Sequence, residues 1–303
     1  MLCGAGGVGG VGISGCSRSD LNHSGTDAPA SAALERAPRV AWVFSSGGPR
    51  CFVHVGVLKA LEELGLKPEL VVGASGGALI AVLWASGCSA QELESLALEL
   101  NPLSLARLAF GSTERLSGSA LAELVRERSR QRLLELLPIP AVCVAQRLAV
   151  GNAGAAAASA ASAAAQTSVV GFNRGDVGLA VQAACAIEGQ FAPVLIQGQR
   201  FVDADLVEPL PVRLTRRLGA QRVLAVDASA HEDRAPPNAE RWRVSDLKKR
   251  ALTAPDAQAA DLVLHPDFGY FVSFSREFRE RCIAAGYRET LVAAQALRQL
   301  HAV

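Results

Sequence analysis

The residues best suited to chemistry form a glycine-rich turn, Gly73-Ala74-Ser75-Gly76-Gly77. The Gly-x-Ser-x-Gly pattern is typical of a sharp turn between a strand and a helix, which projects the serine hydroxyl clear of the backbone. Gly73 and Gly77 relieve the crowding that such an elbow imposes. The N–H groups at the start of the following helix lie beside the reacting atom. The pattern therefore predicts that Ser75 is the nucleophile of an acyl-transfer reaction.

A second glycine-rich turn, Ser46-Gly47-Gly48-Pro49-Arg50, follows the preceding strand-like run. Attack on an ester carbonyl creates an oxyanion, and each preorganised backbone N–H donor stabilises it by roughly 3 to 4 kcal/mol. Gly47 and Gly48 can turn their N–H groups outward at little steric cost, whereas Pro49 has no N–H to donate. Arg50 adds a positive charge beside the loop. We predict an oxyanion hole formed by Gly47, Gly48 and Arg50.

A serine nucleophile needs a base, and one source is histidine. The five histidines are His23, His54, His231, His265 and His301. Two of them lie in the termini, and His54 falls on a predicted helix, where a packed structural role is expected. His231 and His265 follow strand-like runs. Either one fits the chain order Ser, Asp, His of a catalytic triad.

The other source of a base is a carboxylate. Asp203 ends a strand-like segment and begins a turn with Ala204 and Asp205. A buried aspartate has a raised pKa and can accept the proton of a serine hydroxyl directly. An aspartate in a turn is also a common turn former. From the residues alone, a dyad of Ser75 with Asp203 and a triad with histidine both stay open.

These turns must be positioned by a layered α/β domain. Apolar runs alternate with helical stretches, as buried parallel strands do, and the carboxyl ends of such strands meet at one edge of the sheet. The turns at Gly47 and Ser75 are therefore expected to share an edge. The expected strands are Val40–Phe44, Leu70–Val72, Ala141–Ala145, Arg222–Val226 and Asp261–Leu264, with a hairpin over Val194–Val202. Helices are expected around Val57–Leu64, over Ala78–Ser86, and after Ser89, which forms a capping box with Glu92.

The composition excludes several classes of protein. Half of the 303 residues are hydrophobic and the net charge is +1, which excludes a disordered chain and argues against a nucleic-acid partner. No run of 18 apolar residues occurs, so no transmembrane helix is expected. The seven cysteines are scattered and lack Cys-x-x-Cys spacing, so neither a disulfide framework nor a metal site is predicted.

Two segments differ in composition from the rest of the chain. Residues 1–37 are rich in glycine, serine and alanine and are predicted to be a flexible leader before one domain over residues 38–303. The sequence up to Cys16 is similar to the cleavage box of a bacterial lipoprotein signal, so Cys16 is a candidate for lipidation. We expect a bacterial cytoplasmic protein, or an envelope-anchored one if Cys16 is processed. Residues 151–166 are alanine-rich and predicted to form a loop insertion.

Several motifs in order along the chain together resemble the patatin-like phospholipases, over roughly Val40 to Val226. They are Ser45-Ser46-Gly47-Gly48-Pro49-Arg50, His54-x-Gly56-Val57-Leu58-x-Ala60-Leu61-Glu62-Glu63, Gly73-Ala74-Ser75-Gly76-Gly77-Ala78, Phe191-Ala192-Pro193-Val194, Phe201-Val202-Asp203 and Leu210-Pro211-Val212. The resemblance implies a three-layer α/β fold with a mostly parallel sheet between helices. It also implies a Ser75–Asp203 dyad that needs no histidine, metal or cofactor. The implied substrates are phospholipid, lysophospholipid or neutral lipid esters, met at a membrane or micelle surface.

The sequence departs from the pattern of this family at the predicted site. Ser46 stands where the first of three glycines is usual, and Cys51 where a glycine follows the arginine. Asp203-Ala204-Asp205 replaces an Asp-Gly-Gly or Asp-Gly-Ala turn. An alanine forced to a positive φ would be strained and would shift the carboxylate. A non-catalytic, lipid-binding envelope protein that retains the fold therefore stays an alternative beside the two hydrolase mechanisms.

Overall fold

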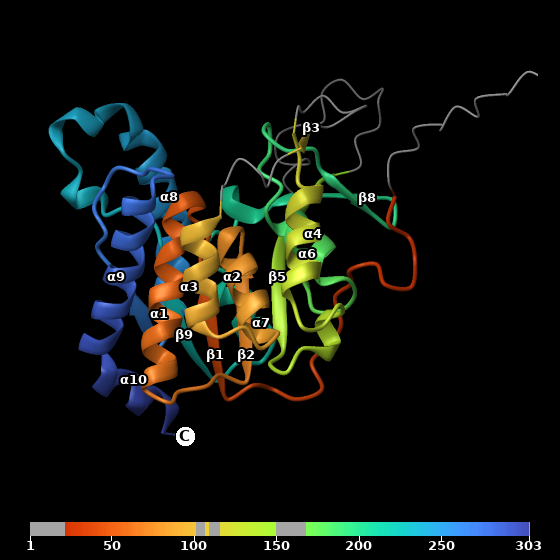
Figure 1. The fold of residues 1–303 in the computed structure, drawn as a ribbon, viewed down its shortest axis with the longest axis horizontal. Helices are drawn as coiled ribbons and strands as arrows, with labels where there is room; N and C mark the ends of the chain where they lie inside the picture. Colours follow the sequence, from red (N-terminus) through yellow and green to blue (C-terminus); the bar gives the residue numbers. More distant parts are fainter. Residues whose placement is uncertain (1–21, 101–106, 109–115, 150–167, 303) are drawn as a thin grey trace, which may run out of the picture.

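Eight strands form the main sheet in the computed structural model of the chain, which describes residues 22–100, 107–108, 116–149 and 168–302 (Figure 1). The strand order is β10-β9-β1-β2-β5-β8-β7, with β6 also paired to β5. The strands from β10 to β5 are parallel, and the other three are antiparallel to their neighbours. The strands are β1 (Val40–Phe44), β2 (Leu70–Ala74), β5 (Ala141–Arg147), β6 (Ser168–Phe172), β7 (Val194–Ile196), β8 (Gln199–Asp203), β9 (Arg222–Val226) and β10 (Leu262–Leu264), with a separate short pair β3 (Arg107–Leu108) and β4 (Leu116–Ser117).

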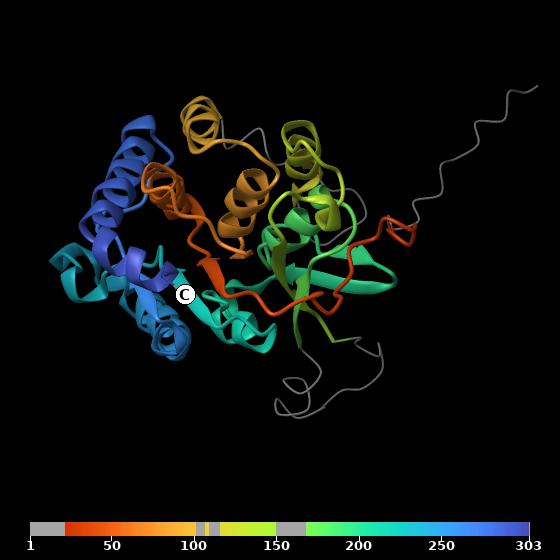
Figure 2. The ribbon, with the colours of Figure 1, turned by 90° about the horizontal axis from the view of Figure 1, so that it is seen from below.

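Helices cover both faces of the sheet, which confirms the predicted three-layer fold (Figure 2). On one face lie α1, α2, α3, α4 and α6, and on the other lie α7 and α8. Two further helices end the chain: α9 packs along α1, and α10 follows it and contacts α9 and β10. The helices are α1 (Phe52–Glu63), α2 (Gly76–Ala85), α3 (Ala90–Glu99), α4 (Ser119–Arg128), α6 (Val177–Ala184), α7 (Val212–Arg217), α8 (Glu240–Ala259), α9 (Arg276–Val292) and α10 (Ala294–His301).

Alternate residues of each central strand pack into different layers. In β1, Trp42 and Phe44 belong to the core beneath α1 and α2, whereas Ala41 and Val43 belong to the core beneath α7. All five residues of β1 are buried, because helices cover both sides of a parallel sheet. The apolar runs of the sequence therefore correspond to strands without a solvent-facing side.

The predicted strands and turns are confirmed with small changes of boundary. β1 and β9 have the predicted bounds, whereas β2 and β5 each extend two residues further. The predicted hairpin is formed by β7 and β8, whose two-residue loop has Gln197 at φ 49° and Gly198 at φ 73°. A two-residue hairpin turn of type I′ needs a positive φ at both central residues, and glycine adopts such a φ at the least cost.

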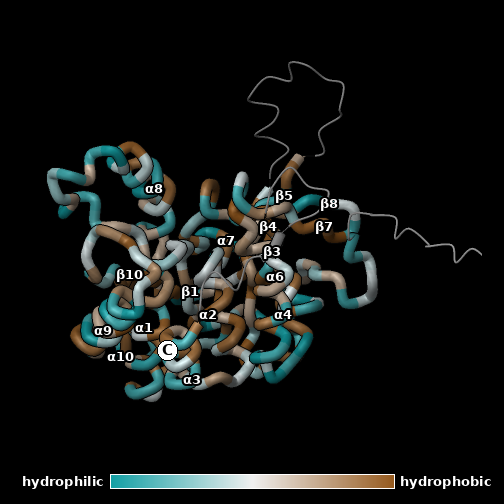
Figure 3. The backbone as a smooth tube through the Cα atoms, turned by 45° about the horizontal axis from the view of Figure 1, so that its top comes forward, coloured by the Kyte–Doolittle hydropathy of each residue, from teal (hydrophilic) through white to brown (hydrophobic). Residues whose placement is uncertain are grey.

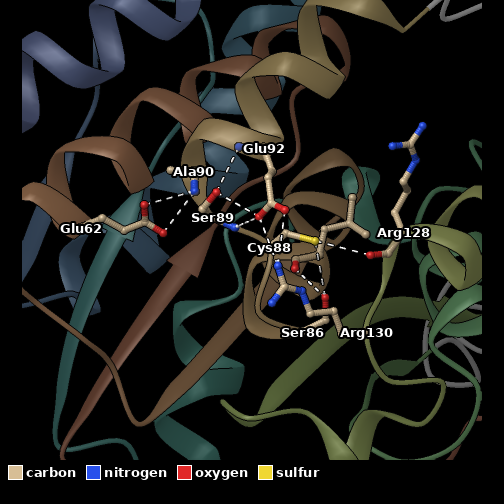
Figure 4. A network of polar contacts seen from close by, with 9 residues as sticks. Glu62, Ser86, Cys88, Ser89, Ala90, Glu92, Arg128 and Arg130 are labelled. Atoms are coloured by element: carbon tan, nitrogen blue, oxygen red, sulfur yellow. Dashed lines mark hydrogen bonds and ion pairs between the residues drawn. The ribbon is translucent and has the colours of Figure 1, made fainter.

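The start of α3 confirms the predicted capping box (Figure 4). Ser89 Oγ accepts a hydrogen bond from the Glu92 N–H at 3.2 Å, and the Glu92 carboxylate accepts one from the Ser89 N–H at 2.7 Å. Glu62 of α1 accepts a further bond from the Ala90 N–H at 3.1 Å. Arg130 pairs with Glu92 at 3.3 Å. The cap therefore also joins α3 to α1 and to the segment after α4.

The predicted leader lies partly outside the described residues. Cys16 and the alanine-rich segment 151–166 fall outside them altogether. Residues 22–37 run along the molecule, where the His23 N–H donates to Leu195 O at 3.0 Å and the Ala30 N–H donates to Arg174 O at 3.1 Å. Over the described ranges, none of the helices is both long and apolar enough to cross a bilayer.

Candidate active site

Ser75 lies in the turn that joins β2 to α2, at the carboxyl edge of the parallel strands. Its backbone has φ 53° and ψ −130°, a region that residues other than glycine rarely adopt. A Cβ on Gly73 would lie 2.5 Å from the backbone of Ala78. A Cβ on Gly77 would lie 2.5 Å from the carbonyl oxygens of Phe44 and Ser45. The two glycines therefore allow α2 to start close against the end of β1.

The register of three strands brings Asp203 beside Ser75. Ala74, the last residue of β2, is opposite Val144 of β5. The next residue of β5, Ala145, is opposite Asp203 of the antiparallel strand β8. Asp203 therefore reaches the level of the serine turn from the other side of β5. A residue distant in sequence becomes a neighbour of Ser75 through strand pairing.

Asp203 is 4% exposed, and its surroundings raise its pKa to about 7. Burial is the main cause, because it removes water from the charged form, and the charge of Asp205 adds to it. The approach of the Ser75 hydroxyl, the N–H of Asp205 and the charge of Lys249 oppose the rise. Oδ1 accepts the Asp205 N–H at 2.9 Å, whereas Oδ2 has no well-formed hydrogen bond to a described residue. One carboxylate oxygen is thus available to the serine side.

The turn after Asp203 is not strained by the missing glycine. Ala204, Asp205 and Leu206 form one turn of 3₁₀ helix, and Asp203 caps it through the bond to the Asp205 N–H. Within the described residues only Ser75 and Gln197 combine a side chain with a positive φ. The chain therefore forms this turn with ordinary backbone angles.

The loop after β1 places two glycine N–H groups beside the same edge. Gly48 has φ 52°, a conformation that favours glycine, and Gly47 lies against Ala228, to whose Cβ a side chain would come within 3.1 Å. Neither the Gly47 N–H nor the Gly48 N–H donates to a described residue. Both donors are thus free to bind a ligand atom.

Neighbouring hydrogen bonds hold this loop in place. The Ser46 N–H donates to Pro209 O at 2.8 Å, which ties the loop to the segment that follows Asp203. Ser45 Oγ accepts from the Ala228 N–H at 2.8 Å and donates to Ser46 O at 3.0 Å. The loop is therefore anchored on both sides before any ligand arrives.

Arg50 does not point freely toward a bound ligand. Its Nη2 donates to Tyr270 O at 3.4 Å, and its Nε is buried without a partner among the described residues. The guanidinium therefore joins the glycine loop to the segment after β10. Sequence reasoning placed Arg50 in the oxyanion hole itself, and that role stays a prediction.

Lys249 was not identified from the sequence. It comes from α8 and donates to Ser46 Oγ at 2.8 Å while forming an ion pair with Asp205. These two partners stand at positions where the sequence departs from the glycines of the patatin-like pattern. Lys249 thus connects the glycine loop to the Asp203 turn. Only the exposed polarity of residues 240–250 could have drawn attention to it, and polarity alone is not specific.

The histidines have other partners. His54 is buried in α1, where its Nε2 is 2.9 Å from Ser45 O, and burial lowers its pKa to about 4. This confirms the packed structural role predicted for it. His231 and His265 stack on each other with ring centroids 3.8 Å apart. His231 Nε2 is 3.1 Å from His265 O, and His265 Nε2 is 3.0 Å from Ser229 O.

Two further observations concern the rest of the described chain: a hollow at another edge of the sheet, and the absence of a cluster that could bind a metal. A hollow of about 230 Å³ is lined by Pro38, Glu69 and Pro140, which precede β1, β2 and β5, so it opens at the opposite edge of the sheet. No cluster of three histidine, cysteine or acidic side chains capable of holding a metal ion occurs among the residues described.

The fold and the geometry around Ser75 together define an α/β protein whose serine turn lies at the carboxyl edge of parallel strands. Within that class, the family model for patatin-like phospholipases matches residues 42–216. The chain belongs to the patatin-like phospholipase family, which confirms the resemblance drawn from its motifs.

Known relatives cover different shares of this chain. An uncharacterized NTE family protein of Mycobacterium tuberculosis is 30% identical over 211 residues, which are 67% of this chain and 54% of the relative. Human patatin-like phospholipase domain-containing protein 6 is 28% identical over 64% of this chain and 14% of its own length. The solved structure of the type III effector protein ExoU is 16% identical with a TM-score of 0.43, over 91% of this chain and 54% of the effector. The chain spans about half the length of the mycobacterial relative.

Proposed function

We propose that this chain is a serine acyl-hydrolase that cleaves carboxylic esters of lipids through a Ser75–Asp203 dyad. The observation that carries the proposal is the β2–β5–β8 register, which brings a buried carboxylate beside a strained, buried serine. The raised pKa of Asp203 suits a general base near neutral pH. Membership of the patatin-like phospholipase family supports a lipid ester as the substrate class.

In the first half of the reaction, Ser75 Oγ attacks the ester carbonyl carbon while its proton passes to the Asp203 carboxylate. The carbonyl oxygen becomes an oxyanion, which the free N–H groups of Gly47 and Gly48 stabilise. Collapse of this intermediate breaks the bond to the alcohol oxygen. Asp203 returns the proton to that oxygen, and the acyl group stays on Ser75.

In the second half, a water molecule gives its proton to Asp203, and its oxygen attacks the acyl carbon. The same two N–H groups hold the second oxyanion. When this intermediate collapses, the bond to Ser75 Oγ breaks and the carboxylic acid leaves. Asp203 gives the proton back to Oγ, which restores both residues.

A fluorophosphonate probe tests the nucleophile, because it reacts covalently with activated serines. We expect stoichiometric labelling at Ser75, located by peptide mass spectrometry, and no labelling of Ser75→Ala. Ser86→Ala is the control, since Ser86 is also buried and lies at the other end of α2. Equal labelling of Ser75→Ala and the unmodified protein would refute the proposal.

A short-chain chromogenic ester tests the base and separates the dyad from the alternatives. With the dyad, Asp203→Asn abolishes turnover, whereas His231→Ala and His265→Ala retain it. With a Ser-Asp-His triad, turnover would instead survive Asp203→Asn and be lost in His231→Ala or His265→Ala. A protein that neither turns over the ester nor reacts with the probe would instead be a non-catalytic lipid binder.

A further inference from the structure

Exposed apolar side chains are concentrated in two segments near the proposed site. Of the nine large hydrophobic residues that are exposed in the described chain, six lie on α8 or in the segment before α9. We call them the α8 patch. They are Trp242, Val244, Leu247, Phe271, Val272 and Phe274. Scattered single apolar residues are normal on a protein surface, but a concentration of this kind marks a binding surface.

The two segments of the α8 patch are joined to each other. The rings of Trp242 and Phe271 meet edge to face, with centroids 5.6 Å apart. Tyr270, the neighbour of Phe271, donates its hydroxyl hydrogen bond to Asp246 of α8. In Figure 3, hydrophobic stretches alternate with hydrophilic ones along the outward segment around α8. The patch is therefore one surface built from residues some 30 positions apart in the sequence.

Positive charges surround the apolar side chains, and most of them have no acidic partner in the described part of the chain. Residues 240–250 contain five basic and two acidic residues. Lys249 is engaged with Asp205, but Arg241, Arg243, Lys248 and Arg250 form no ion pair with a described residue. The Arg241 guanidinium lies over the Trp242 ring at 3.7 Å. A helix with basic and apolar exposed side chains is the composition that binds at an anionic lipid surface.

The α8 patch adjoins the edge that carries Ser75. Lys249 of the same helix contacts Ser46, and Arg50 donates to Tyr270 O, next to Phe271. In Figure 1, the α8 segment stands at the upper end of the molecule, toward which β1 and β2 run. A surface that met the α8 patch would therefore also face the glycine loop and the serine turn.

We propose that the α8 patch docks this protein on an anionic phospholipid surface and so presents the Ser75 edge to lipid. Charge complementarity selects an anionic surface, because four cations next to the apolar side chains lack acidic partners among the described residues. The choice of a lipid surface rests on the proposed function, since an ester held in a bilayer must be reached at the interface. Trp242 and the phenylalanines enter the headgroup region, and the basic side chains contact the phosphates.

Tryptophan fluorescence of the full chain reports on this docking. The chain has three tryptophans, of which Trp42 and Trp84 are buried and stacked on each other, whereas Trp242 is 36% exposed. Vesicles of phosphatidylcholine with phosphatidylglycerol should shift the emission to the blue, because the exposed indole leaves water. Pure phosphatidylcholine vesicles should give little shift. Trp242→Phe should remove the shift while the protein still sediments with anionic vesicles.

Co-sedimentation with the same vesicles measures the contribution of each part of the patch. Phe271→Ser with Phe274→Ser, and separately Arg243→Glu with Lys248→Glu, should each weaken binding about tenfold or more. The controls are Val292→Ser, an exposed apolar residue elsewhere, and Arg298→Glu, an exposed cation on α10. Both controls should bind like the unmodified protein. All variants should hydrolyse a soluble short-chain ester at the unmodified rate.

The outcomes separate this proposal from the proposed enzyme activity. Ser75→Ala should bind vesicles normally but cleave no ester, so retained ester cleavage in this variant, with intact vesicle binding, would refute the dyad and leave the docking surface standing. Patch variants that bind anionic vesicles as tightly as the unmodified protein would overturn the docking surface. So would equal binding to neutral and anionic vesicles. A dimer that the same variants dissociate, without any vesicle binding, would instead assign the patch to a second copy of the chain.

Discussion

Opposing electrostatic effects act on the pKa of the Asp203 carboxyl group. Burial and the charge of Asp205 raise its pKa, whereas Ser75, the Asp205 N–H and Lys249 lower it, and the balance is a pKa of about 7. An aspartate with the ordinary pKa of about 4 would be ionised at neutral pH but would be a weaker base. The buried group gains basicity and still is ionised in about half of the molecules at pH 7.

The rate of ester cleavage should follow the ionisation of Asp203. Below pH 7 the carboxyl is protonated and cannot accept the Ser75 proton, so kcat/KM should fall about tenfold per pH unit. Above pH 7 the rate should reach a plateau. A soluble short-chain ester is the substrate for this measurement, because binding to a lipid surface then plays no part. A rate that stays constant from about pH 5 to about pH 9 would contradict the assignment of Asp203 as the base.

Lys249 should position the site and tune its pKa. Lys249→Met removes the bridge between Ser46 and Asp205 as well as a charge that lowers the pKa of Asp203. We expect kcat to fall about 10- to 100-fold, since small displacements of catalytic groups are costly. The midpoint of the pH–rate profile should move to higher pH.

Two variants check the role of Lys249. Lys249→Arg should restore part of the rate, because it keeps the charge. Lys248→Met, on the exposed neighbouring residue, should leave both kcat and the midpoint unchanged. An unmoved midpoint in Lys249→Met would mean that this ammonium group has no electrostatic effect on the base.

The junction between β1 and α2 determines where the serine turn can lie. Gly77→Ala would place a Cβ 2.5 Å from the carbonyl oxygens of Phe44 and Ser45. Because both obstacles are backbone atoms, α2 or the glycine loop must move. We expect a loss of about 1 to 3 kcal/mol of unfolding free energy together with most of the ester cleavage.

Chemical denaturation and the chromogenic ester assay measure the two effects of Gly77→Ala. Gly25→Ala is the control, since no atom lies within 4 Å of a Cβ there. That variant should match the unmodified protein in both measurements. Full activity in Gly77→Ala would show that the serine turn tolerates a displaced α2.

Local patterns in the sequence predicted the parts of the fold that depend on local physics. β1, and β9 after its exposed first residue Arg222, are continuous apolar runs because both faces are buried, and the cap at Ser89 uses a contact three residues away. The serine turn at Ser75 was predicted with its strand and its helix. The family resemblance was needed to choose Asp203 over His231, since an aspartate in a turn has no distinctive spacing.

Contacts between distant segments were not predictable in this way. The bridge from Lys249 to Ser46 spans 203 positions, and residues 240–250 resemble an ordinary solvated helix. From the sequence, Ala204 was expected to be strained if its turn required a positive φ. The turn is instead a 3₁₀ helix without a positive φ. Whether a turn needs glycine depends on the conformation that the surrounding chain imposes.

The helices at the carboxyl end complete the core of the patatin-like domain. They lie outside residues 42–216, which the family model matches, yet α9 packs closely along α1. A Cβ on Gly56 of α1 would lie 1.9 Å from Ile283 O, and a Cβ on Gly286 of α9 would lie 2.2 Å from Val53 O. In α10, His301 accepts a hydrogen bond from Trp42 of the central sheet at 3.1 Å.

Gly286→Ala should therefore destabilise the whole protein, even though alanine favours a helix over glycine by about 1 kcal/mol. The added methyl group meets the backbone of α1, which also carries His54 against the glycine loop, so α9 must separate from α1. Ala284→Val adds bulk on the exposed side of the same helix and should change stability by about 0.5 kcal/mol or less. In thermal unfolding, the fluorescence of buried Trp42 and Trp84 and the remaining ester cleavage should fall together at a lower Tm in Gly286→Ala. Two separate transitions would instead mean that α9 and α10 unfold independently of the layer that holds Ser75.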